Sequence, residues 1–148
     1  MHRIVTFVLL FILAAPWSVL AADNFAGSVK NVQGSVVVKR QTMSLKAVRG
    51  MKIYANDVIS TGQDGAVGII LQDNTIFSLG PDSELELKEY VFVPDQGSFS
   101  MLAKMIKGTF VYMSGLIGKL SPESITIETP VGTIAIRGTR FVAHIAGN

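Results

Sequence analysis

Three aspartates at positions 64, 73 and 82 have the type and spacing that could form a metal site. They stand nine residues apart in the triplets Gln63-Asp64-Gly65, Gln72-Asp73-Asn74 and Pro81-Asp82-Ser83. β-Rolls built from nine-residue repeats bind calcium through aspartates in their turns. Those rolls also need paired glycines to wrap the ion, and here only Gly65 follows an aspartate. We therefore interpret the three aspartates as turn formers and predict no metal ligand.

A catalytic set is not visible in the sequence. The chain has no cysteine, and His144 is the one histidine outside the expected leader. It lies among apolar residues without an acidic or nucleophilic neighbour, so a structural role is favoured. The run Gly115-Leu116-Ile117-Gly118-Lys119 is too short between its glycines for a phosphate loop and lacks the hydroxyl residue after the lysine. Glu84 and Glu86 share one face of a strand and fit its solvated side. We predict no enzyme activity and no cofactor.

Two other groups of residues have alternative interpretations. Arg137 lies between Ile136 and Gly138, where pairing with a carboxylate or with turn carbonyls is favoured over binding of an anion. A set of methionines and phenylalanines is expected to lie in the core, although it could form an adaptable binding surface if it were uncovered; its members are Met101, Met105, Met113, Phe99 and Phe110.

The pattern around these residues predicts an all-β domain. About five strand-like residues alternate with a four-residue corner through the three aspartate triplets, a spacing that fits a β-meander or the rungs of a β-roll or solenoid. A β-sandwich is the alternative. Residues 99–106 have both helical and alternating spacing, and their short length favours a strand. Residues 114–123 are expected to form a loop.

The stretch 125–141 is expected to form the closing strands. Ile125 and Ile127 alternate with polar residues up to Thr129, and Pro130 ends the ladder because it has no N–H to donate. The apolar pattern then resumes, and Arg137-Gly138-Thr139 interrupts it before Phe141. We predict strand, corner, strand, glycine turn and strand, with no catalytic chemistry.

The N-terminus is expected to be a helical signal peptide spanning residues 1–21. A positive start is followed by an apolar run that Pro16 breaks, and the small residues Val19 and Ala21 suit a signal peptidase. Cleavage after Ala21 is preferred and cleavage after Ala22 is the close alternative. An uncleaved anchor is less favoured because the apolar run is short. Residues 22–148 would then form one domain, with no further run able to span a membrane, in the periplasm or outside the cell.

Composition limits the classes of partner. Thirteen Lys and Arg against eleven Asp and Glu become twelve against eleven once Arg3 leaves with the leader, a net charge of +1. This balance gives no indication of nucleic-acid binding. The one tryptophan, Trp17, lies in the leader. Without cysteines, the exported chain would depend on its apolar core for stability.

The ordered set of turn motifs between about residues 27 and 145 resembles the FecR domain. The motifs are Val32-Gln33-Gly34-Ser35-Val36, Asn56-Asp57-Val58-Ile59-Ser60-Thr61-Gly62, residues 64–69, Asp73-Asn74-Thr75, Pro81-Asp82-Ser83-Glu84-Leu85, Lys107-Gly108-Thr109-Phe110, Thr129-Pro130-Val131 and Arg137-Gly138-Thr139-Arg140-Phe141. The family-motif residues that are candidates for structure or binding are Asp57, Gly62, Thr129, Pro130, Arg137, Gly138 and Thr139.

The resemblance implies an exported interaction or sensing module. The namesakes of the family regulate iron-siderophore uptake and join a cytoplasmic anti-sigma segment, a membrane helix, this periplasmic β-domain and a receptor-contacting part. This sequence is expected to lack the anti-sigma segment, the membrane helix and the receptor-contacting part, because a leader precedes the domain and the chain stops after the final strand. The family has no catalytic residues to transfer. We expect a non-enzymatic module that binds an envelope protein, with binding to a carbohydrate or envelope polymer as the alternative.

Overall fold

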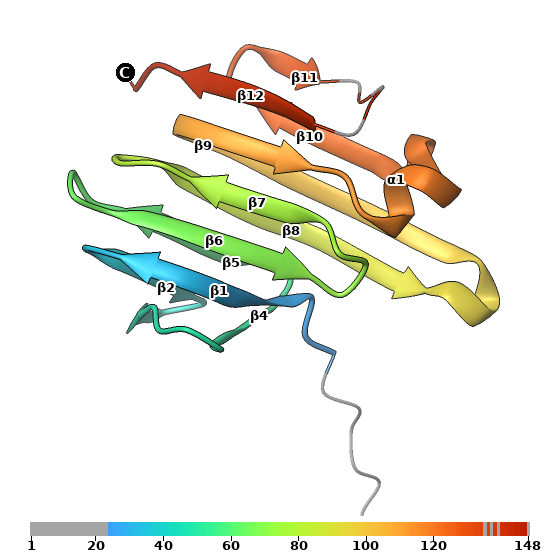
Figure 1. The fold of residues 1–148 in the computed structure, drawn as a ribbon, viewed down its shortest axis with the longest axis horizontal. Helices are drawn as coiled ribbons and strands as arrows, with labels where there is room; N and C mark the ends of the chain where they lie inside the picture. The colour runs from blue at the N-terminus through green and yellow to red at the C-terminus, as the bar shows by residue number, and fades with distance from the viewer. Residues whose placement is uncertain (1–23, 135, 137, 139, 148) are drawn as a thin grey trace, which may run out of the picture.

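The computed structural model describes residues 24–134, 136, 138 and 140–147, and these fold mainly as β-strands (Figure 1). The expected leader, Arg137 and Thr139 lie outside the described residues. The strands are β1 (Gly27–Gln33), β2 (Val36–Arg40), β3 (Met43–Lys46), β4 (Lys52–Ile53), β5 (Asp57–Thr61), β6 (Ala66–Leu71), β7 (Ile76–Leu79), β8 (Glu84–Val93), β9 (Ser98–Met113), β10 (Ile125–Thr129), β11 (Gly132–Ile134) and β12 (Arg140–Ile145). Three short helices are η1 (Pro94–Gln96), α1 (Leu116–Leu120) and η2 (Pro122–Ser124). The all-β prediction is confirmed.

The strands form one curled sheet whose two halves face each other. The main path runs β3-β2-β5-β8-β9-β7-β6-β1-β4, and β10 and β12 attach to β9 beside it. The front layer holds β1, β6, β7 and β12, and the back layer holds β2, β5, β8 and β10 (Figure 1). β9 belongs to both layers. Its pairing with β10 is parallel, whereas its pairings with β7, β8 and β12 are antiparallel.

The bend of β9 joins the two layers at Gly108. The first part of β9 pairs with β8 up to Lys107, and the last part pairs with β7 from Phe110. Gly108 has φ +98°, and a Cβ there would overlap Ser83. Ser83 fixes this point, since its hydroxyl accepts a hydrogen bond from Thr109 N (3.0 Å). Sequence reasoning expected a turn at residues 107–109, but the structure has one bent strand.

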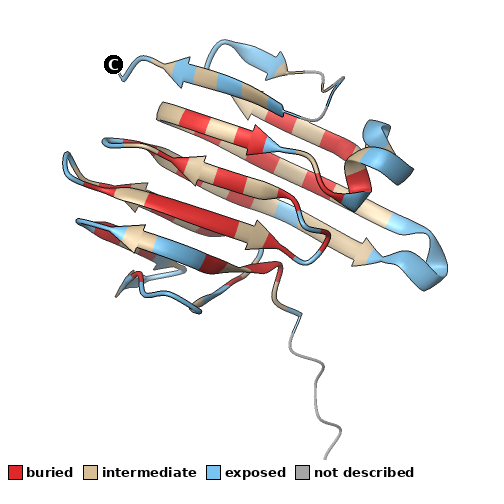
Figure 2. Cartoon of the chain, viewed as in Figure 1, coloured by how far each residue is buried: buried red, intermediate tan, exposed pale blue. Residues whose placement is uncertain are grey.

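The core fills the space between the layers. Alternate residues of the facing strands point inward and are almost fully buried, as the period of a β-strand requires (Figure 2). The largest are Tyr112, Phe77, Phe110, Ile53, Ile59, Ile69, Leu85, Met101 and Met105. The core interpretation of the methionines is confirmed for Met101 and Met105, whereas Met113 is 40% exposed. In β9, the strand interpretation of residues 99–106 is also confirmed.

The aspartate triplets are turns, as predicted, but they serve different connections. The turn at Asp73 joins the paired strands β6 and β7, whereas those at Asp64 and Asp82 carry the chain between the layers. The expected loop at residues 114–123 contains α1 and the start of η2 instead. No helix within the described residues is long and apolar enough to cross a membrane.

Candidate binding site

Asp57 and Arg40 form a partly buried ion pair that ties together two strands and a turn. The Asp57 side chain is fully buried, and Arg40 donates to both of its oxygens, from Nε (2.8 Å) and Nη2 (2.7 Å). Tyr54 N donates to the same carboxylate (2.9 Å), and the guanidinium lies 4.4 Å from the centre of the Tyr54 ring. The hydrogen bond to Asp57 raises the pKa of Arg40 above its usual value. Both carboxylate oxygens of Asp57 accept hydrogen bonds from groups of the fold itself, so this motif residue has a structural environment.

Gly62 lies at the corner where three turns meet. Its N–H donates to Ser35 O (2.9 Å), and its carbonyl accepts from Gly65 N (2.9 Å) and Asp82 N (3.0 Å). Asp64 accepts a hydrogen bond from Ser35 N (3.2 Å). A Cβ at Gly62 would lie 3.2 Å from the Ser35 Cβ, closer than most such contacts. The environment of Gly62 is therefore one of close backbone packing.

Asp73 is the one buried member of the aspartate series. Its carboxylate accepts from Thr75 N (3.1 Å), Thr75 Oγ1 (2.7 Å), Tyr90 OH (3.0 Å) and Ile117 N (3.1 Å). Its carbonyl accepts from Leu116 N (2.7 Å). Burial, together with the adjacent Asp73 charge, raises the pKa of Tyr90 above its usual value. Asp73 thus fixes α1 to the turn between β6 and β7.

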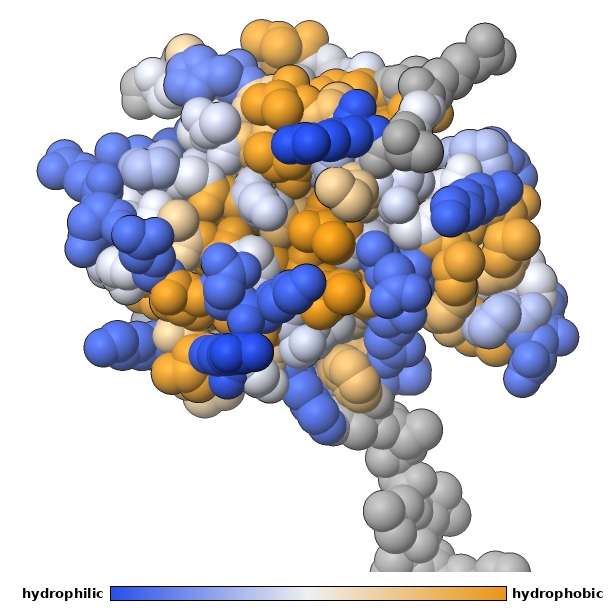
Figure 3. Space-filling view, viewed as in Figure 1, coloured by the Kyte–Doolittle hydropathy of each residue, from blue (hydrophilic) through white to orange (hydrophobic). Residues whose placement is uncertain are grey.

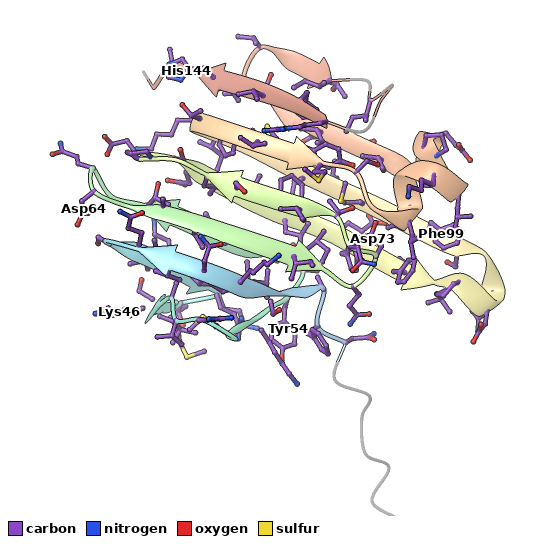
Figure 4. The ribbon with its side chains drawn as sticks, in the orientation of Figure 1. Lys46, Tyr54, Asp64, Asp73, Phe99 and His144 are labelled. Atoms are coloured by element: carbon purple, nitrogen blue, oxygen red, sulfur yellow. The ribbon has the colours of Figure 1, made fainter. Side chains whose placement is uncertain are left out.

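The three aspartates do not converge on a common point. Asp64 and Asp73 lie at opposite ends of the strands (Figure 4), and the backbone N–H of Asp82 bonds to the corner near Asp64. The described part of the chain has no group of three or more His, Asp and Glu that could hold a metal ion. The glutamates Glu84 and Glu86 lie opposite Lys107 and Lys104 in the ladder, on the half-exposed side of β8.

Thr129 and Pro130 form the turn between β10 and β11. Thr129 Oγ1 donates to Gly132 O (2.8 Å), and Thr129 pairs with Gly132 in the ladder. Pro130 and Val131 form the tip, where Val131 is 95% exposed. Gly138 has φ +133° with no atom near its missing Cβ. The predicted roles of Arg137 and Thr139 lie outside the described residues.

Sequence reasoning did not identify β12 as an exposed edge strand. Arg140, Val142 and His144 are exposed, whereas Phe141 packs inward and stacks on Tyr112 with ring centres 5.1 Å apart. His144 Nδ1 lies 3.0 Å from Thr109 Oγ1 on β9. The alternation of polar and apolar residues in 140–145 could have indicated a strand with one exposed face. Only the strand order shows that β12 lies at an edge of the described sheet. In the part of the chain that is described, β12 pairs with β9 alone.

An open wedge lies beside the end of β12. Its volume is about 580 Å³, and it separates the β10–β11 turn from the C-terminal end of β12 above the β9 bend. The lining residues are Ile106, Lys107, Pro130, Val131, His144, Ile145, Ala146 and Gly147. The lining is mainly apolar and carries no carboxylate side chain, and the family motifs contribute Lys107, Pro130 and Val131 to it. Together, the β12 edge and this wedge are the candidate binding site.

Comparison with known proteins identifies one family. The family model described as FecR protein matches residues 57–148, which begins at β5 and includes the β12 edge and the wedge. Strands β1 to β4 precede the match, although they complete both layers of the same sheet. Searches of curated proteins and of solved structures each gave no match.

Proposed function

Because the chain belongs to the FecR family, whose members act in signalling and regulation at the cell envelope, we propose that it is a non-enzymatic, exported module that binds an envelope protein. The expected signal peptide at residues 1–21 supports a periplasmic or secreted location. The proposal places residues 22–148 in one domain without a cofactor.

The observation that carries this proposal is the edge of β12, a strand that in the described part of the chain pairs with β9 alone. A sheet edge presents N–H and C=O groups that can pair with another extended chain, and natural proteins usually cover or charge such edges. Here the edge exposes Val142, which is 63% exposed, between Arg140 and His144 and next to the wedge. The buried carboxylates of Asp57 and Asp73 are, by contrast, fully engaged inside the fold. Binding at the edge therefore accounts for the exposed groups better than catalysis does.

Affinity capture tests the proposed function. Purified protein is immobilised and exposed to envelope extract, with an unfolded sample of the same chain as control. We expect recovery of a discrete protein that the unfolded sample does not retain. Recovery of no protein, together with clear retention of the folded chain on peptidoglycan, would overturn the proposal. Cell fractionation with N-terminal sequencing tests export, and a mature chain beginning at Ala22 is expected.

A glycan-binding module is the second candidate, favoured by one shallow groove. The groove has a volume of about 240 Å³ and is lined by Asn24, Phe25, Ala55, Gln72, Tyr90, Val91, Phe92 and Val93. Amide side chains beside aromatic rings suit a sugar. However, Lys52 lies over the Phe25 ring and the Tyr90 hydroxyl is bonded to Asp73. Loss of glycan retention in a Phe92→Ala variant that still folds would favour this candidate.

A further inference from the structure

The free side of β12 offers a longer edge than the other ends of the sheet. β12 has six residues, whereas the edge strands β3 and β4 have four and two. The segment between β3 and β4 also folds back against the sheet, since Ala47 N donates to Val36 O (2.9 Å) and Val29 N to Met51 O (2.9 Å). The length of β12 suits an added strand of about five residues.

The outward face of β12 has an apolar centre between two basic residues. Val142 lies between Arg140 and His144 on one side of the strand, because alternate residues share a face. Their partners on β9 are Val111 for Val142 and the exposed Met113 for Arg140. Figure 3 shows hydrophobic residues gathered over β12 and the adjoining part of β9, with hydrophilic residues across them. A strand added here would meet an apolar neighbour flanked by the guanidinium of Arg140 and the imidazole of His144.

The inward face of β12 continues into the wedge. Phe141, Ala143 and Ile145 are half-buried and pack against the core. An added strand would direct its inward side chains beside them, toward the apolar wedge lined by Ile106 and Val131. Those positions therefore favour apolar side chains.

The charges around this edge favour an acidic partner over a second copy of the chain. Lys107 and His144 line the wedge, and Arg140 stands at the other end of β12. One carboxylate residue, Asp82, lines an adjoining opening together with Lys107 and His144. Two copies paired antiparallel about Val142 would bring Arg140 of each copy next to His144 of the other. That arrangement offers neither Arg140 nor His144 a carboxylate, so a second copy lacks the complementary charge that an acidic segment supplies.

Resting on the function proposed above, we propose that the free edge of β12 binds one extended acidic segment of a partner protein by strand addition. The segment carries an acidic residue beside Arg140, three apolar residues across Val142 and the wedge, and a second acidic residue beside His144. This pattern reads the same in both directions, so it suits a parallel or an antiparallel addition. Backbone hydrogen bonds would supply affinity, and the side-chain pattern would supply specificity.

A synthetic blocked peptide tests the proposal on the full folded chain. Its core is Glu-Val-Val-Val-Glu between short Ser-Gly flanks, and the matched probe carries lysine in place of both glutamates. Binding is followed by backbone amide shifts and by protection from hydrogen exchange. We expect the acidic peptide to protect amides of residues 140–145, and the lysine peptide to bind at least about tenfold more weakly, a difference near 1.4 kcal/mol.

Variants locate the site and exclude a general effect of charge. Arg140→Glu should weaken the acidic peptide about tenfold and strengthen the lysine peptide, while Val142→Asp should abolish protection of β12. Lys46→Glu makes the same charge change on β3 and should leave binding unchanged. Circular dichroism and urea unfolding confirm that each variant folds.

Three outcomes would overturn the proposal. The first is absence of binding at millimolar acidic peptide, and the second is equal binding of both peptides. The third is a change in the amide shifts of β12 with protein concentration alone, which would assign the edge to a second copy. The proposed function would survive any of these if affinity capture still recovered the same envelope protein with both wild type and Arg140→Glu. If affinity capture recovers no protein, the proposed function is rejected whether or not the peptide binds.

Discussion

Asp57 carries a fully buried carboxylate whose charged partner, Arg40, keeps 27% of its side chain exposed. The pair joins β2 to β5, and Tyr54 N and Lys52 O complete its hydrogen bonds. Asp73 is similarly enclosed by Thr75, Tyr90 and α1. At the residue scale, the polar groups with the greatest burial thus hold the strands and turns in place.

Replacing Asp57 by Asn should destabilise the fold substantially. The change removes the charged partner of Arg40 and replaces one buried acceptor oxygen by an N–H donor group. For a partly exposed pair, we expect the free energy of unfolding to fall by about 2–4 kcal/mol. Urea unfolding measures the difference. Asp95→Asn is the matched control, since Asp95 is exposed in η1, and it should change stability by less than about 0.5 kcal/mol. A loss below that value in Asp57→Asn would show that the pair is not stabilising.

Alkaline pH should destabilise the wild type more steeply than a Tyr90→Phe variant. Burial raises the pKa of Tyr90 in the folded state, so the folded chain keeps a phenolic proton that the unfolded chain releases above about pH 10. The stability that this proton contributes to the folded state is fully present below about pH 10 and is lost as the pH rises further. Unfolding free energies measured from pH 8 to 11 give the two slopes. Parallel slopes would contradict the assignment.

At the scale of elements, β9 is the strand on which both layers depend. It pairs with β7, β8, β10 and β12, and it passes between the layers at Gly108. The hydroxyl of Ser83 occupies the space beside this glycine and bonds to Thr109. The position of β12, and hence of the open edge, follows from this bend.

Gly108→Ala should therefore disrupt the fold far more than a glycine replacement elsewhere. An alanine at this position would have to adopt a positive φ, and its Cβ would overlap Ser83. We therefore expect the free energy of unfolding to fall by more than about 3 kcal/mol, or the protein to be insoluble. Gly97→Ala is the control, because Gly97 has φ +60° with no atom near the added Cβ. It should cost about 1 kcal/mol. Equal losses in thermal unfolding would refute a special role for the bend.

Local pattern was enough to predict most of the strands and the three aspartate turns, but not the bent strand at Gly108, the helix α1 or the long-range contacts. The alternation in β8 and the turn residues at Asp64, Asp73 and Asp82 are encoded within a few neighbours. In contrast, the Arg40–Asp57 pair spans 17 positions, and the contact of Asp73 with Ile117 spans 44. No local signal distinguishes the buried Asp73 from the exposed Asp64. The edge position of β12 likewise depends on where β9 bends, which a glycine alone does not reveal.

At the scale of the whole molecule, the curled sheet separates residues that the nine-residue spacing appears to group. Successive turns alternate between the two ends of the strands, so Asp73 lies at the opposite end from Asp64 (Figure 4). Within the described residues, β11 pairs with β10 and β12 pairs with β9, and the two strands do not pair with each other. This arrangement leaves the edge of β12 for the proposed partner.

Calcium should have no effect on stability. Because Asp64, Asp73 and Asp82 do not surround one point, a chelator should leave the melting temperature unchanged to within about 1 °C, and millimolar calcium should not raise it. Differential scanning calorimetry with and without chelator makes the comparison. A shift of several degrees would indicate a bound ion and contradict the structural reading of these turns, since a ligand that binds the folded state raises its stability.

Site-specific photocrosslinking in living cells tests the central claim most directly. A photoreactive residue replaces Val142 on the β12 edge, and the control replaces Lys30, which is exposed on the internal strand β1. We predict one discrete protein adduct from position 142, lost when Arg140→Glu is added, and none from position 30. Absence of an adduct at 142, or the same adduct from both positions, would contradict an envelope-protein partner bound at this edge.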